Sequence, residues 1–397
     1  MPVLYDGCAV TDARGPDLVL DQAVLVAGDT IAWMGPAETA PREAADLAVI
    51  DASGATLVPG MVDGHSHLTL PGGARWIQHL HDDPAALLAV AEDNGARLVA
   101  SGVRWARDVG APRGEAGGRV RALSLEVRDR WRGRRDRPYV RAAGTWITRL
   151  GTLVGTVEVA DGDGLVAAVL EQLDDGSDLV KLYLDGPDRD TAPFTAAEVA
   201  RATTAARSRG ARVTAHATTL HGARAAVLGG VDAIEHGVEI DADLAAAMAA
   251  RGTFLVTTHS VWESWLTFGD TTAITRFADR ATVHDRRERA HASTRVAHAA
   301  GVRIAGGSDF GGGSVRAGHL PWEVSCLVAC GLEPWEALAA VTWRGGDLLG
   351  ESTAGRVTVH GPADFFLVHG DPLSDPAALW RVWRHAQPES LGTIPPP

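Results

Sequence analysis

The sequence predicts an α/β protein, and three observations lead to this fold class. From residue 58 onward, apolar runs that end in small or polar residues alternate with alanine-rich helical segments, as in a parallel sheet covered by helices. There are eight such runs, and short β segments lie near both ends of the chain. The 397 residues leave room for a barrel of about 250 residues and a smaller partner. We therefore expect a (β/α)8 TIM-like barrel with a small composite β-sandwich domain from both termini.

The two terminal segments carry β character outside this barrel. Residues 1–57 contain the runs AVLVAG and TIAWMG between glycine and aspartate turns, and residues 350–397 contain GRVTVHGPADFFLVHGDPL. The simplest arrangement joins 1–57 and 350–397 in one β domain and leaves 58–349 for the barrel.

The eight candidate barrel strands follow one another at the spacing of strand–helix units. They are Val58–Asp63, Gly102–Val109, Tyr139–Gly144, Leu179–Leu184, Arg212–His216, Val231–His236, Thr253–Thr258 and Val302–Asp309. Catalytic groups of such barrels lie at the carboxyl ends of the strands, so the residues that end these runs are the candidates for a site.

Six side chains of metal-ligand type lie on or next to these strands: His65, His67, Lys181, His216, His236 and Asp309. The His-x-His pair follows an extended segment, where side chains two apart point to the same face, so both imidazoles reach one metal. The others are separated by whole strand–helix units. We expect all six to converge at one end of the barrel.

Lys181 is the one lysine in a chain with 36 arginines. Only lysine can lose its proton on burial and then act as a nucleophile, form a Schiff base, or react with CO2 to give a carbamate. The run Leu179–Leu184 around it has the character of a buried strand, where an unpaired charge is costly. We therefore expect a chemical role for this amine.

Charge, hydropathy and cysteine content exclude several classes of protein. The 37 basic and 50 acidic residues give a net charge of −13, which argues against nonspecific nucleic-acid binding. We find neither a signal peptide nor an apolar run of membrane length, and the three cysteines are too few for a disulfide framework. A cytoplasmic protein with no nucleic-acid or membrane partner is expected.

The segment from 119 to 141 holds nine arginines, interleaved with Glu126, Asp129 and Asp136. We interpret it as a solvated helix and loop with internal ion pairs. The alternative is a rim that attracts an anionic substrate.

The chain resembles the amidohydrolase superfamily, within it the imidazolonepropionase-like and prolidase-like branch. The matching motifs are VPGMVDGHSHL, SGVRWARDVG, SDLVKLYLDG, VTAHAT, DAIEHG, GGSDFGGG, GLEPWEALAAVT and GRVTVHGPADFFLVHGDPL. They occur in family order over nearly the whole chain.

This resemblance implies a centre of two divalent metal ions, with Zn²⁺ the expected metal. His65, His67 and Asp309 would hold the first ion, His216 and His236 the second, and a CO2-derived carbamate on Lys181 would bridge them. Imidazole and carboxylate oxygen are suitable zinc ligands, and paired metals need a bridging anion. An arginine at position 181 would supply no such oxygen.

The expected reaction is hydrolysis of a carbon–nitrogen bond in an amide, a peptide or a cyclic amide, by attack of a metal-bridging hydroxide. The metals lower the pKa of bound water toward about 7 and polarise the carbonyl. Asp309 takes the proton as general base and returns it to the leaving nitrogen as general acid.

The substrate contacts depart from the family pattern. Prolidase-like members carry a tyrosine in the motif that here reads His216-Ala217-Thr218, and a glycine-histidine loop where this chain has residues 145–151. The usual grip on a substrate carboxylate is therefore absent. Candidate contacts are Trp146, Arg149, Tyr183, His259, Trp262 and His319. A small molecule or a peptide is the expected substrate, and a homo-oligomer is compatible with the sequence.

Rival interpretations use the same residues. A mononuclear deaminase needs a similar histidine–aspartate set but has no use for Lys181, whereas a phosphotriesterase-like or lactonase-like hydrolase shares the binuclear site and differs in substrate. Structural relatives without metal lack some ligands, and all six are present here. Gly311–Gly313 lacks the spacing of a dinucleotide-binding loop.

Overall fold

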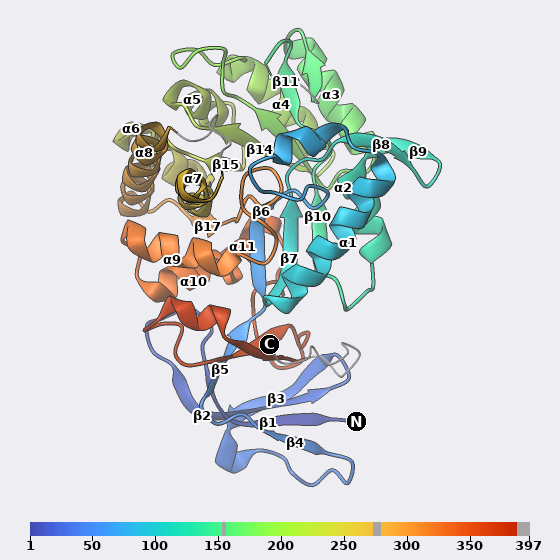
Figure 1. The fold of residues 1–397 in the computed structure, drawn as a ribbon, viewed down its shortest axis with the longest axis vertical. Coiled ribbons are helices and arrows are strands. Elements are labelled where there is room, and N and C mark those ends of the chain that lie inside the picture. Colours follow the sequence, from blue (N-terminus) through green and yellow to red (C-terminus); the bar gives the residue numbers. More distant parts are fainter. Residues whose placement is uncertain (153–155, 273–278, 387–397) are drawn as a thin grey trace.

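The computed structural model describes residues 1–152, 156–272 and 279–386 (Figure 1). The end of the predicted second β segment, from 387 to 397, lies outside the described residues. In Figure 1, the blue and dark-red strands from the two ends of the chain lie together below a larger part built of strands and helices.

The terminal strands form one sheet. Its order is β19-β18-β5-β1-β2-β3, and β4 also pairs with β1. The strands are β1 (Val3–Val10), β2 (Val19–Ala27), β3 (Thr30–Pro36), β4 (Ala48–Asp51), β5 (Ala55–Pro59), β18 (Phe365–His369) and β19 (Val382–His385). β5 pairs with β18 in antiparallel register, with Leu57 opposite Leu367, so the two ends of the chain share one hydrogen-bonded sheet.

The middle of the chain forms two parallel sheets. The first has the order β10-β7-β6, and the second has the order β12-β11-β13-β14-β15-β16-β17. The strands are β6 (Met61–Ser66), β7 (Val103–Asp108), β10 (Tyr139–Ala142), β11 (Ile147–Arg149), β12 (Val157–Val159), β13 (Leu179–Tyr183), β14 (Arg212–Ala217), β15 (Ala233–His236), β16 (Phe254–Thr257) and β17 (Ile304–Gly306). Two single parallel bridges join the sheets. Ala143, directly after β10, pairs with Leu179 of β13, and Ser66 of β6 pairs with Phe310, which follows β17.

The structure divides the first predicted barrel strand, residues 58–63, between two sheets. β5 ends at Pro59 in the terminal sheet, and β6 begins at Met61 in the parallel one. At Gly60 a Cβ atom would lie 2.4 Å from Cγ of Arg104, so only glycine fits this close passage. The chain therefore moves from one sheet to the next at Gly60, directly before the strand that carries the histidine pair.

Helices cover the parallel strands, and their apolar faces pack into two large cores. They are α1 (Pro84–Ala100), α2 (Leu123–Trp131), α3 (Gly162–Asp174), α4 (Ala196–Ser208), α5 (Leu220–Leu228), α6 (Ala242–Arg251), α7 (His259–Thr271), α8 (Arg280–Ala299), α9 (Leu320–Cys330), α10 (Pro334–Ala340) and α11 (Trp343–Leu349). Shorter elements are β8 (Arg113–Ala116), β9 (Arg119–Ala122) and the 3-10 turns η1 (Ala37–Thr39), η2 (Trp76–His81) and η4 (Pro376–Trp380).

Local sequence signals start and stop these helices. Thr195 and Glu198 form a capping box at the start of α4, in which each side chain accepts a hydrogen bond from the other residue's backbone amide. Gly252 ends α6 in the left-handed conformation, with φ of +68°. Such signals fix where each helix leaves its strand.

The arginine-rich segment from 119 to 141 forms a network of ion pairs. Arg121 contacts Glu126 and Asp129, and Arg134 and Arg137 both contact Glu92 on α1. Its arginines therefore tie α2 to neighbouring elements. Within the described residues, no helix is long and apolar enough to cross a membrane.

Candidate metal centre

A cavity of about 400 Å³ lies at the carboxyl ends of the parallel strands, and it is lined by all six side chains of predicted ligand type. His65 lies on β6, and His67 directly follows that strand. Lys181, His216 and His236 lie on β13, β14 and β15, and Asp309 lies in the loop after β17. Parallel strands end at one edge of a sheet, which is why residues so far apart in sequence meet.

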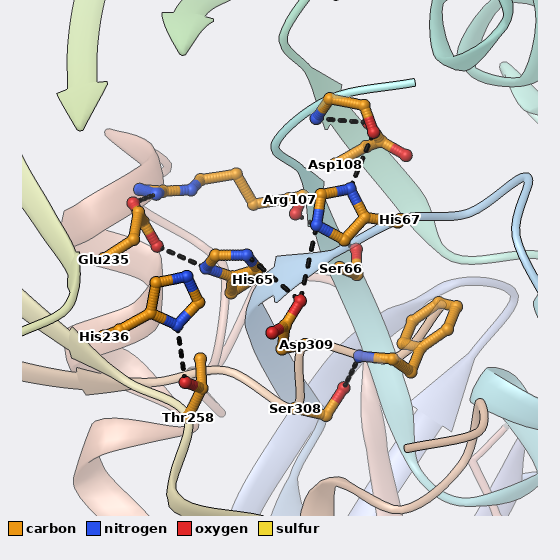
Figure 2. Close-up of polar contacts among 12 residues, drawn as sticks. His65, Ser66, His67, Arg107, Asp108, Glu235, His236, Thr258, Ser308 and Asp309 are labelled. Atoms are coloured by element: carbon orange, nitrogen blue, oxygen red, sulfur yellow. Dashed lines mark hydrogen bonds and ion pairs between the residues drawn. The ribbon is translucent and has the colours of Figure 1, made fainter. Parts of the chain in front are cut away.

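His65, His67 and Asp309 form one compact group (Figure 2). Oδ1 of Asp309 lies 3.3 Å from Nε2 of His65 and 3.4 Å from Nε2 of His67. Asp309 has φ of +50°, a left-handed conformation that aspartate adopts more readily than most residues. Its amide donates to the carbonyl oxygen of His65 at 2.8 Å, which fastens the loop to the strand of the histidine pair.

Each histidine of this group has one ring nitrogen bound outside the cavity centre. Nδ1 of His65 is 2.7 Å from a carboxylate oxygen of Glu235, and Nδ1 of His67 is 2.7 Å from the carbonyl oxygen of Gly110. Since these acceptors take the Nδ1 proton, Nε2 of each ring faces Asp309 as a free electron pair.

His216 and His236 follow the same rule with different nitrogens. Nε2 of His216 lies 3.0 Å from Asp185, which leaves Nδ1, whereas Nδ1 of His236 lies 2.8 Å from the Thr258 hydroxyl, which leaves Nε2. Their rings lie 4.6 Å apart, centroid to centroid. All four imidazoles thus keep one nitrogen for a ligand, the arrangement that metal-binding histidines show.

Lys181 is buried, with 1% of its surface exposed, and its Nζ has no hydrogen-bond partner among the described residues. Burial lowers the pKa of this amine to about 8, although the charge of nearby Glu235 acts in the opposite direction. An orphaned buried ammonium is costly, so this atom is suited to a reaction or a ligand rather than to packing.

The electrostatics of His236, His65 and Asp309 favour their metal-binding forms. His67 differs: burial would lower its pKa, but the neighbouring Asp309 raises it. Burial, followed by the charges of His216 and His65, holds the pKa of His236 well below its usual range. Burial and the charge of Lys181 lower the pKa of His65. Burial by itself would raise the pKa of Asp309, but its interactions with His65, His67 and His236 hold it well below its usual range. Neutral imidazole and carboxylate are the forms that bind metal ions.

Sequence reasoning missed Glu235, whose carboxylate contacts the candidate ligand His65. Glu235 is fully buried and contacts His65 and the guanidinium of Arg107 (Figure 2). It also contacts the hydroxyl of Thr214. Neighbours on a strand point to opposite faces, so the pattern admits only one of Glu235 and His236 to the site. His236 has φ of +71°, and this left-handed turn at the strand end lets both reach it.

Two further carboxylates fix the loops around the centre. Asp63 accepts hydrogen bonds from the amide and hydroxyl of Ser308, next to Asp309, and Asp108 accepts them from the amides of Leu68 and Gly110. The sequence signal that could have found them is their position. Asp63 lies two residues before the predicted ligand His65, and Asp108 lies two residues before Gly110, which bonds His67.

The predicted substrate contacts divide into two groups. Trp146, Tyr183 and Trp262 line the cavity. Arg149, His259 and His319 are not among its lining residues: Arg149 donates to the carbonyl oxygen of Pro193, His259 bonds Thr294, and His319 bonds the carbonyl oxygens of Arg316 and Ala317. Their role in substrate binding stays a prediction.

The cavity wall also contains residues besides these ligands and contacts. They are mostly apolar, with an acidic and a basic member: Trp76, Ile77, Leu80, Thr156, Asp185, Thr218, Val261, Trp265, Arg286, Gly312 and Gly313. Trp262 and Trp265 meet edge to face, with ring centroids 5.2 Å apart. Apolar walls with a few polar groups are typical of a pocket for a small molecule.

Comparison with known proteins gives a consistent result. Residues 56–384 match the model of the amidohydrolase family. An uncharacterized protein of Mycobacterium tuberculosis is 31% identical over 352 residues, covering 87% of this chain and 86% of that protein. The imidazolonepropionase of Streptomyces griseus is 26% identical over 404 residues, covering 92% of each chain. The solved structure of a Xaa-Pro dipeptidase with bound methionine superposes with a TM-score of 0.82 at 23% identity, covering 96% of this chain and 97% of that one.

Proposed function

The chain belongs to the amidohydrolase family, and from this membership we propose that it hydrolyses an amide, peptide or cyclic amide bond. The family makes it a metal-dependent hydrolase of carbon–nitrogen bonds, and the kind of bond is our proposal. The observation that supports this proposal is the hydrogen bonding of the four cavity histidines. In each ring, one nitrogen bonds a protein atom and the other is left for a metal ion.

The residues present fit two divalent ions, with Zn²⁺ as the proposed metal. His65, His67 and Asp309 would hold one ion and His216 and His236 the other. When bound, such ions supply Lewis acidity toward the carbonyl and lower the pKa of water. The orphaned Nζ of Lys181 supports a carbamate: the amine adds CO2, releases one proton, and presents two oxygens in place of one ammonium.

Asp309 is the proposed proton carrier. Its pKa lies well below the usual range, so it stands as a carboxylate and accepts a proton from the attacking water. It then delivers this proton to the nitrogen that leaves as the C–N bond breaks. The hydrogen bond from its amide to His65 keeps the carboxylate in place during both transfers.

We also propose that the parallel strands close into a (β/α)8 barrel, residues 58–349, beside a composite β domain of 1–57 and 350–397. The single bridges from both edges of the β10-β7-β6 sheet to the other parallel sheet support closure. The pairing of β5 with β18 supports the composite domain.

Metal analysis of purified protein and a substrate panel test this function. We expect two equivalents of metal and turnover of N-acyl amino acids, dipeptides or lactams. Lys181→Arg keeps a positive charge but cannot form a carbamate, so we expect this variant to lose metal. Its activity should fall by more than about 100-fold, which is more than the loss usual for a residue that only hydrogen-bonds to a metal ligand. Asp309→Asn should abolish turnover.

The same panel separates the alternatives. Turnover of phosphotriesters or lactones in place of amides would favour the related hydrolase chemistry. One metal per chain, with release of ammonia from an aminated ring, would favour a deaminase. A Lys181→Arg variant with both metals and full activity would rule out the carbamate.

A further inference from the structure

One charged side chain on the cavity wall takes no part in the candidate metal centre. Arg286 lies in the second turn of α8, is exposed, and lines the cavity. Among residues 1–152, 156–272 and 279–386 no hydrogen bond or ion pair neutralises its guanidinium. The acidic lining residues are engaged elsewhere, Asp185 with His216 and Asp309 with His65 and His67.

The neighbouring arginines of the same helix behave differently. Arg287 pairs with Glu263 and Glu288, and Arg289 pairs with Glu239 and Asp285. Neither of these two arginines lines the cavity. Arg286 is therefore distinguished from its neighbours by both its place and its free charge.

Arg286 lines the same cavity as Tyr183 and His216. The Tyr183 ring stacks on the His216 ring, with centroids 4.1 Å apart. The cavity that holds the candidate metal ligands is therefore also the one that the charge of Arg286 lines.

We propose that Arg286 is a specificity-determining residue that binds a carboxylate of the substrate. A planar guanidinium forms two parallel hydrogen bonds to a carboxylate, and an unneutralised charge in a pocket favours an anionic ligand. The rest of the wall includes four tryptophans, Trp76, Trp146, Trp262 and Trp265. A flat apolar group packs well against such a wall.

The inference rests on the proposed function and names its substrate class: amides that join a flat apolar acyl group to an amino acid with a free carboxylate. Such a molecule suits a cavity of about 400 Å³. Arg286 would take the place of the carboxylate grip that is missing at Thr218 and in residues 145–151.

Equilibrium binding to the purified metal-containing enzyme tests the proposal without turnover. The probes are 3-benzoylpropionate, a ketone isostere of N-benzoylglycine with no C–N bond, and its neutral methyl ketone, 1-phenylpentane-1,4-dione. By calorimetry we expect the wild type to bind the carboxylate at least about tenfold more tightly than the diketone. Arg286→Gln should remove this preference, and Arg289→Gln, on the same helix, should retain it.

Two results would overturn the inference: equal or undetectable binding of both probes by the wild type, or an unchanged preference in Arg286→Gln. Turnover of N-benzoylglycine and related amides is measured separately. Turnover without a carboxylate preference rejects only the role of Arg286. A preference lost in Arg286→Gln, with no C–N substrate hydrolysed by the wild type, supports the role of Arg286 and counts against the proposed function.

Discussion

At the scale of single residues, buried partners decide which atom each ligand presents. Glu235 illustrates this, because one carboxylate holds Nδ1 of His65 and the guanidinium of Arg107, which is 3% exposed. The charge of Arg107, followed by that of Lys181, outweighs burial and holds the pKa of Glu235 well below its usual range. Glu235 is therefore a positioning residue for the centre.

Glu235→Gln keeps the shape of this side chain and removes its charge. We expect metal affinity to fall about 10–100-fold, because His65 loses the partner that fixes its tautomer. Stability should fall by roughly 3–5 kcal/mol, because Arg107 is left buried without a counter-charge. Chelator competition and thermal denaturation measure the two effects.

Glu171→Gln is the matched control, because Glu171 is exposed and lies 3.7 Å from Arg113. We expect less than about 1 kcal/mol from it. An E235Q protein with wild-type metal affinity would contradict the positioning role.

Residue types and strand positions were enough to predict the six cavity side chains, because strand ends converge in any parallel α/β fold. Glu235 was missed because its placement depends on the left-handed turn at His236. The alternation of side chains along a strand does not predict such a turn. Arg286 was missed because the sequence of a helix does not tell which of its arginines will pair with acidic residues in the folded protein. The ring of His259, a predicted substrate contact, bonds Thr294, and its role in substrate binding stays a prediction.

At the scale of elements, the loop after β17 and strand β6 approach more closely than side chains allow. A Cβ on Gly307 would lie 2.4 Å from Cβ of His65 and 2.5 Å from its backbone nitrogen. Backbone atoms cannot move aside as a flexible side chain can. This contact fixes the distance between Asp309 and the histidine pair.

Gly307→Ala should therefore separate these two elements. We expect a loss of about 1–3 kcal/mol, as for other overpacked sites, together with weaker metal binding. Gly15→Ala is the control, since a Cβ there meets nothing within 4 Å. Equal melting temperatures and metal contents for the two variants would contradict this account.

Helices α7 and α9 meet at a second buried carboxylate. Glu323 in α9 is fully buried and accepts a hydrogen bond from the amide of Ser260 in α7 at 2.7 Å. Burial raises the pKa of Glu323 to about 7 from its ordinary value of 4.5. Between about pH 4.5 and pH 7, Glu323 therefore keeps its proton in the folded state and has lost it in the unfolded state.

This difference predicts a pH dependence with a definite sign. The stabilising contribution is full below about pH 4.5 and is lost as pH rises to about 7, on the order of 3 kcal/mol. Glu323→Gln cannot ionise, so its melting temperature should fall less than that of the wild type between pH 5 and pH 8. Parallel curves for both proteins would show that Glu323 does not titrate in this range.

Strand and helix order could be predicted from apolar periodicity, but the boundaries depended on contacts between distant segments. Residues 58–63 were predicted as one strand, and the break at Gly60 is set by Arg104 from β7. The three-residue strands β11 and β12 are too short to give a periodic signal. Elements were therefore predictable in kind and order, and less so at their ends.

At the scale of the whole molecule, the terminal sheet unites the first and last described segments. β5 is an inner strand, held by β1 on one side and by β18 on the other. Through Gly60 it continues into β6, which carries His65. The stability of the candidate centre is thereby linked to the far end of the chain.

A chain that stops after residue 349 lacks β18 and β19 and leaves one edge of β5 unpaired. We expect this truncated protein to aggregate, because an exposed inner strand pairs with other chains. A chain that stops after residue 386 retains every described strand and is the control. Size-exclusion chromatography of both proteins measures the effect, and a monodisperse, metal-binding 1–349 protein would contradict it.

The pairing of β5 with β18 also sets the timing of folding during synthesis. At about 5–20 residues per second, a ribosome needs roughly 15–60 s to travel the approximately 300 residues between these strands. Throughout that interval the nascent chain displays an open strand edge, which is a target for chaperones. Strands β18 and β19 leave the exit tunnel long after β5, so the terminal sheet is completed only once these strands have been synthesised.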